Sequence, residues 1–165
     1  MRTLAREPKA TQQTTSSTLT KPSRAFLGQN RDVQSIMNCW EAVLLSAYRA
    51  GAINWNWIHN LYVSTPPADW ITAMSRGALH NYAIPGPNLR IPQRGDLVFF
   101  DGLAHVALAT GKGSDVFTFW PPPNTPFTAG GTLDRVKVFT IEELVTWWEA
   151  HMPPAPTVEF AAPAW

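Results

Sequence analysis

The sequence predicts an α+β domain in which helices come first and an antiparallel sheet follows. Residues 36–48 place apolar side chains at helical steps of three and four. From residue 97 onward, short apolar runs alternate with turn residues instead. The 165 residues are 45% hydrophobic and 15% charged, which allows a sizeable core and excludes a wholly disordered protein. No apolar run approaches the roughly 20 residues of a membrane span, so no span is expected.

Three helices are expected before the sheet. The first covers residues 36–48 and stops at Gly51, because glycine commonly follows the last turn of a helix. The second covers residues 55–63. The third begins at Pro66, a residue suited to the first helical position, and ends near Gly77.

Four strands are expected in the second half, and they form a meander. The dipeptide Asp101-Gly102 is a turn signal between the first two strands, and a glycine-rich turn at residues 111–113 follows the second. A proline-rich loop, residues 121–131, separates the third strand from the fourth. The four strands cover residues 97–100, 105–110, 116–120 and 136–139.

One more helix and an irregular tail complete the prediction. Thr140 and Glu143 have the spacing of a capping box, so a helix is expected from there to about residue 150. Residues 153–165 are proline-rich and are expected to be an irregular tail that docks through Phe160 and Trp165.

The first 31 residues differ from the rest in charge and composition. They hold six basic residues and one acid, whereas the remaining chain holds seven basic and eleven acidic residues. Serine, threonine, glutamine and proline dominate them, as in a segment that is disordered on its own. They lack the apolar core of a secretory signal peptide, and the body lacks the basic stripe of a nucleic-acid-binding protein. We therefore expect a leader (1–31), a domain (32–152) and a tail (153–165), with no nucleic acid as partner.

The single cysteine and one histidine are the candidate reactive residues. Cys39 stands at the expected start of the first helix, where unsatisfied N–H groups would stabilise a thiolate and lower its pKa. His105 heads a strand directly after a tight turn, where it could serve as the base. Taken singly, each residue is as readily a buried structural side chain. Asp96 and Asp101 have no metal-ligand spacing with a histidine, so neither a metal nor another cofactor is expected.

The order of these features resembles the papain-like superfamily. The cysteine at a helix start is followed by RGDLVFF at residues 94–100 and by HVAL at residues 105–108. More specifically, residues 37–120 resemble the branch of bacterial cell-wall endopeptidases and CHAP-type amidases. The resemblance implies a papain-like fold, with N-terminal helices packed on a small antiparallel sheet, and a Cys39–His105 pair that attacks an amide bond. The motif Asn38-Cys39-Trp40-Glu41 is nearer to papain and papain-fold toxins than the Asp-Cys-Ser-Gly of wall enzymes.

The resemblance also implies further site residues. A polar side chain on the next strand would orient the histidine, and Thr118 holds that position, with Asn124 as the alternative. The oxyanion would meet the backbone N–H of Cys39 and the side-chain amide of Gln34 or Asn38. Four tryptophans could line a cleft or equally belong to the core, and these are Trp40, Trp55, Trp57 and Trp120.

A second resemblance lies in the leader. Residues 9–36, KATQQTTSSTLTKPSRAFLGQNRDVQSI, are similar to a leader of proteins encoded beside extracellular contractile injection systems. This implies a cargo protein made in the bacterial cytoplasm and loaded through its leader into the particle tube or onto an adaptor. The particle would deliver it outside the cell or into a target cell.

Together these features predict a toxin effector that is a papain-like thiol enzyme acting on a protein or peptidoglycan substrate. The same residues serve a peptidase, a deamidase and a transglutaminase, so the reaction stays open among them. A peptidoglycan endopeptidase or amidase is one alternative. Another is a catalytically inactive papain-fold module that serves as a structural or binding cargo, which the uncertain third position favours.

Overall fold

The computed structural model describes residues 39–82, 90–119 and 136–165. The helical elements are α2 (Cys39–Arg49), α3 (Trp55–Ser64), the 3₁₀ turn η1 (Pro67–Asp69), α4 (Trp70–Met74) and α5 (Ile141–His151). The strands are β1 (Ser75–Asn81), β2 (Leu97–Phe100), β3 (His105–Ala109), β4 (Asp115–Phe119), β5 (Val136–Thr140) and β6 (Val158–Pro163). Within these ranges, no helix combines the length and the apolar character needed to cross a membrane.

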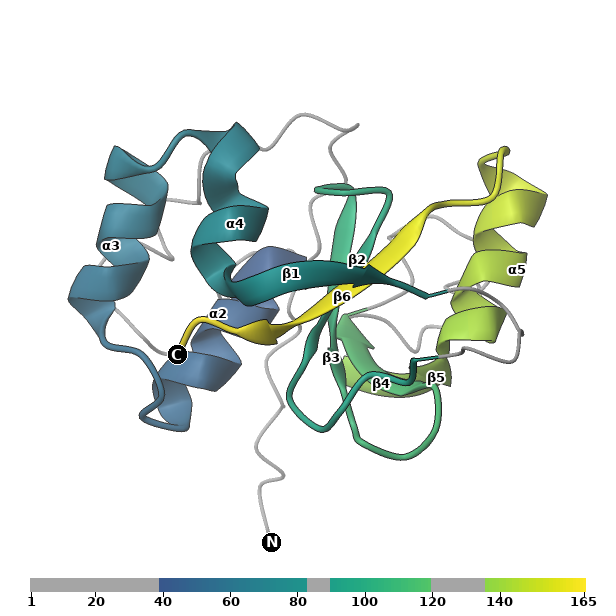
Figure 1. Ribbon diagram of the computed structural model, residues 1–165, viewed down its shortest axis with the longest axis horizontal. Helices are drawn as coiled ribbons and strands as arrows, with labels where there is room; N and C mark the ends of the chain where they lie inside the picture. The colour runs from purple at the N-terminus through teal and green to yellow at the C-terminus, as the bar shows by residue number, and fades with distance from the viewer. Residues whose placement is uncertain (1–38, 83–89, 120–135) are drawn as a thin grey trace, which may run out of the picture.

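The strands form one six-stranded antiparallel sheet in the order β1-β6-β2-β3-β4-β5. Figure 1 shows α2, α3 and α4 gathered at one side of the molecule and α5 at the other. The α+β class, the order of helices before sheet and the meander from β2 to β5 are confirmed.

Two predictions of local structure were wrong, and both concern the same edge of the sheet. Residues 75–81, expected to end a helix, form β1, and residues 158–163, expected to be irregular, form β6 between β1 and β2. The domain therefore extends through residue 163 rather than ending at 152. The proline-rich segment that precedes β6 predicts a loop. The strand forms nevertheless, because its backbone groups pair with β1 on one side and with β2 on the other. The expected docking is correct, since Phe160 is buried and Trp165 packs edge-on against Trp57.

Strand β2 divides the core into two clusters, one on each face of the sheet. Leu97 and Phe99 point into the cluster formed with α2, α3 and α4, while Val98 and Phe100 point into the cluster formed with α5. All four side chains are fully buried, which explains why this strand is a continuous apolar run without alternation. The helix that carries Cys39 is thus fixed against one face of the sheet.

Two local predictions hold at the ends of elements. The Thr140 hydroxyl accepts from the Glu143 backbone N–H (3.1 Å), and the Glu143 carboxylate accepts from the Thr140 N–H (2.8 Å), so the capping box is present. The turn between β2 and β3 has positive φ at Asp101 (49°) and Gly102 (63°), as the dipeptide predicts. This tight turn brings His105 directly opposite Phe100.

Candidate active site

Trp40 fixes the start of α2 beside the start of β3. Its indole N–H donates a hydrogen bond to the Leu103 carbonyl (3.1 Å), in the turn that precedes His105. Its ring stacks on Phe99, with centroids 5.9 Å apart, and meets the edge of Trp70. Trp40 is therefore a core residue that positions the neighbouring cysteine, and it does not line an open cleft.

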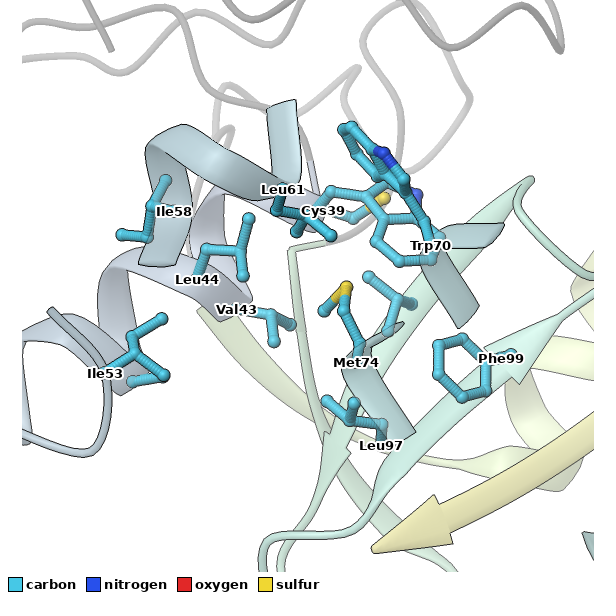
Figure 2. Packing of buried hydrophobic residues seen from close by; sticks show 13 residues of the cluster. Cys39, Val43, Leu44, Ile53, Ile58, Leu61, Trp70, Met74, Leu97 and Phe99 are labelled. Atoms are coloured by element: carbon cyan, nitrogen blue, oxygen red, sulfur yellow. The ribbon is translucent and has the colours of Figure 1, made fainter. Parts of the chain in front are cut away.

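Cys39 is the first residue of α2 and lies in the core cluster on this face. Figure 2 shows it among the labelled cluster side chains, which include Leu61 of α3 and Trp70 of α4. The backbone N–H of Val106 donates a hydrogen bond toward the Cys39 sulfur. Since Val106 directly follows His105, the thiol contacts β3 one residue away from the histidine.

Burial controls the acidity of the thiol. It raises the pKa of Cys39 to about 11, although N–H groups of Val106, Trp40 and Cys39 itself act to lower that pKa. The expectation of a lowered pKa was therefore wrong. The helix N-terminus acts in the expected direction, but loss of solvent around the sulfur disfavours the thiolate more strongly. At neutral pH the Cys39 sulfur keeps its proton.

His105 and Thr118 lie together on neighbouring strands. The imidazole Nε2 and the threonine hydroxyl oxygen are 2.6 Å apart, and both residues are buried. The ring of Phe100 lies against the imidazole, with centroids 5.7 Å apart. The structure thus brings the candidate base to the residue that the sequence singled out to orient it.

Burial also lowers the pKa of His105 to about 3, so the imidazole is neutral at physiological pH. With the pKa of Cys39 at about 11, the proton belongs on sulfur and no thiolate–imidazolium pair forms in this buried arrangement. Both groups are therefore neutral at physiological pH. They face different sides of the sheet, because Cys39 lies in the cluster formed with α2, α3 and α4, whereas the His105 ring lies against Phe100, which points into the cluster formed with α5.

The buried histidine should make the fold sensitive to acid. In the unfolded chain His105 regains a pKa of about 6.5, so between pH 6.5 and 3 the unfolded state binds a proton that the folded state does not. The contribution of neutral His105 to the free energy of unfolding is fully present above pH 6.5. Below that pH the free energy of unfolding should fall, with a slope that approaches about 1.4 kcal/mol per pH unit. Denaturant unfolding between pH 7 and pH 5 measures this slope, above the range in which most carboxylates titrate.

Two variants separate this histidine from the rest of the protein. His105→Gln keeps a hydrogen-bonding amide but cannot titrate, so its stability should be nearly flat over that pH range. His59→Gln removes an exposed histidine of α3 and should keep the slope of the parent. An unchanged slope in His105→Gln would contradict the assignment.

The structure also brings together two residues that sequence reasoning missed. Glu41, in the first turn of α2, is only 2% exposed, and its charge acts to raise the pKa of both Cys39 and Tyr62. Burial is the main cause of the raised Tyr62 pKa. An acidic residue two positions after the cysteine is a weak sequence signal, because a carboxylate in a first helical turn is ordinarily a surface residue.

Several predicted site residues lie outside the described residues. These are Gln34, Asn38, Trp120 and Asn124. Trp55 and Trp57 are half-buried and pack against the cluster that holds Cys39, so they belong to the edge of the core. Across the three described ranges, no group of three or more histidine, cysteine or acidic side chains could hold a metal ion.

The site therefore consists of a cysteine and a histidine at one end of a central strand, in an α+β domain. No protein-family model, no curated protein and no solved structure gives a significant match to this chain.

Proposed function

We propose that this protein is a papain-like thiol enzyme that attacks an amide bond through Cys39 and His105. One observation carries the proposal. The Cys39 sulfur contacts the backbone of Val106, next to a histidine whose ring is already held by the Thr118 hydroxyl. A nucleophile, a base and a group that orients the base are the parts such chemistry requires.

The proposed mechanism follows from the neutral state of both groups. In this mechanism the His105 ring first turns from Phe100 toward the face of the sheet that holds Cys39. The imidazole then accepts the thiol proton as the sulfur attacks the substrate carbonyl, so proton transfer accompanies bond formation. The imidazolium then gives the proton to the departing amine or ammonia, which leaves a thioester. Water regenerates the thiol and releases a carboxylic acid, whereas an amine forms a new amide. The Thr118 hydroxyl, 2.6 Å from Nε2, would hold the ring in place while the imidazole receives the proton.

The test compares proteins from susceptible cells that express either the full chain or Cys39→Ser. New protein N-termini that depend on Cys39 indicate a peptidase. The mass change of deamidation at glutamine or asparagine indicates a deamidase, and new isopeptide bonds indicate a transglutaminase. Identical protein profiles in cells that express the two chains at equal levels would contradict the proposal.

Thr118→Val is expected to destabilise the protein and to slow its reaction. The valine has nearly the shape of threonine but removes the hydroxyl that meets His105 at 2.6 Å in a buried site. Loss of one buried hydrogen-bond partner costs about 1–3 kcal/mol. Denaturant unfolding measures the stability. Turnover of the substrate identified by the comparison with Cys39→Ser measures the reaction. Thr118→Ser keeps the hydroxyl and should restore most of both, so equal losses in the two variants would contradict an orienting role.

A second function is favoured by the burial itself. Burial raises the pKa of Cys39 to about 11 and lowers that of His105 to about 3. Such shifts favour an inactive papain-fold module that is retained as a structural or binding cargo. Substrate turnover that depends on Cys39 separates the two functions, because an inactive module would show none.

We also propose that the leader loads the protein into a contractile injection particle. The support is the sequence resemblance over residues 9–36 and the excess of basic residues in the leader. A chain that lacks residues 2–30 should fold and react as the parent does, yet be absent from purified particles. Fusion of those residues to an unrelated small domain should carry that domain into particles. If the shortened chain still co-purifies with particles at the parental level, the body and not the leader is responsible for loading.

A further inference from the structure

A pocket of about 560 Å³ lies at the β1 edge of the sheet, whereas Cys39 lies against β3. This volume falls within the range of small-ligand sites. Two strands and the segment before β2 form its walls. Side chains that can bind a ligand there are Arg76 and His80 of β1, Arg90, Gln93 and Asp96 of the segment before β2, and Phe160 of β6.

Strand β1 is irregular between Arg76 and His80, the two basic residues that it contributes to the pocket. The pairing of β1 with β6 shifts register between Arg76 and His80, so the strand bulges there. Gly77 lies within the bulge at a φ of 82°, a conformation that favours glycine. Bulges re-aim side chains at the edges of sheets and are common beside binding sites.

The charges of the pocket favour an anion. The lining contains two guanidinium groups, of Arg76 and Arg90, and one carboxylate, of Asp96, which already accepts a hydrogen bond from the Gln93 backbone N–H (2.7 Å). Arg90 donates to the Nδ1 atom of His80 at 2.8 Å, which steadies the arginine against β1. Both arginines are exposed, so donor groups stay accessible to a ligand.

The floor of the pocket is apolar. Phe160 is buried, and the His80 ring lies against it with centroids 5.5 Å apart. We propose that the pocket binds a small organic anion, with a carboxylate or phosphate on the two arginines and a hydrocarbon body over Phe160. Guanidinium groups pair with these oxyanions in a two-point geometry, which explains the choice of ligand class.

The test is a titration of the full chain with three probes that each contain a phenyl ring. Binding is measured by calorimetry and by the NMR shifts of β1 amides. Benzoate carries a carboxylate, phenyl phosphate carries a phosphate, and benzyl alcohol carries no charge. At least one anion should bind, and benzyl alcohol should bind at least about tenfold more weakly. The stronger anion tells which oxyanion the site prefers. No binding of either anion at millimolar concentration, or equal binding of the alcohol, would overturn the proposal.

Variants place the binding in this pocket. Arg76→Gln and Arg90→Gln should each weaken the bound anion by about tenfold or more, because each removes a charged donor. Arg49→Gln changes an exposed arginine at the end of α2 and should leave binding unchanged. If Arg90→Gln binds as the parent does, or if Arg49→Gln weakens binding equally, the anion does not sit in this pocket.

Discussion

A chain that ends at Thr157 is expected not to fold, because it lacks β6. That strand lies between β1 and β2 and pairs with both, so its removal leaves two strand edges without their partner. It also removes the buried side chains of Val158, Phe160 and Ala161 from the core. Loss of a buried aromatic side chain alone costs about 3–5 kcal/mol, and the stability of a whole domain is about 5–15 kcal/mol. Circular dichroism and NMR dispersion should therefore report an unfolded chain.

A shorter truncation is the matched control. A chain that ends at Pro163 keeps β6 and loses only two residues. One of them, Trp165, packs against Trp57 at the edge of the cluster formed with α2, α3 and α4. It should fold, with a lower melting temperature than the parent. If the chain that ends at Thr157 still unfolds cooperatively, β6 is an accessory to the sheet and the original prediction of a docked tail was adequate.

Three of the four strands that the sequence predicts have side chains that face the core, and the fourth, β5, is predicted although none of its residues is buried. β2 to β4 are largely buried, and their apolar runs are visible in the sequence. β1 has an almost fully exposed pattern and holds Arg76 and Gly77, so no periodicity distinguishes it from a loop or a fraying helix. β6 does alternate, with Val158 and Phe160 buried, but prolines on both sides outweigh two apolar residues in a local reading. Its place in the sheet depends on partners far away in sequence.

At the candidate site, too, local features could be predicted from the sequence, whereas features that depend on distant parts of the chain could not. A helix start and a strand start are local features, so position along the chain was enough to nominate Cys39 and His105, whereas the resemblance to papain-like enzymes nominated Thr118, which the structure places against His105. Their acidity did not follow, because burial of the sulfur depends on how α2, α3 and α4 meet the sheet. The pocket that contains Arg76 and Arg90 could not be predicted either, because it requires β1 and β6 to pair.

Cys39→Ala is expected to abolish toxicity and turnover while the protein stays folded. If the proposed thioester forms, no other group can replace the sulfur, since Cys39 is the only cysteine of the chain. Removal of a catalytic nucleophile lowers turnover by on the order of a thousandfold or more. The structural cost is small by comparison, because alanine retains the Cβ and is well suited to a helix. Toxicity in a susceptible cell and unfolding by denaturant measure the two effects separately.

Alkylation of the parent shows whether the thiol behaves as its burial requires. With a pKa of about 11, reaction of folded Cys39 with iodoacetamide should be slow at neutral pH and rise about tenfold per pH unit up to pH 10. In urea the unfolded chain should react faster and level off above pH 9, near the ordinary pKa of a thiol. Cys39→Ala should take up no label under either condition. If the folded alanine variant is as toxic as the parent, the thiol mechanism is wrong even where the alkylation profile agrees. If alkylation instead reaches its plateau near pH 7, a preformed ion pair replaces the neutral pair inferred from burial.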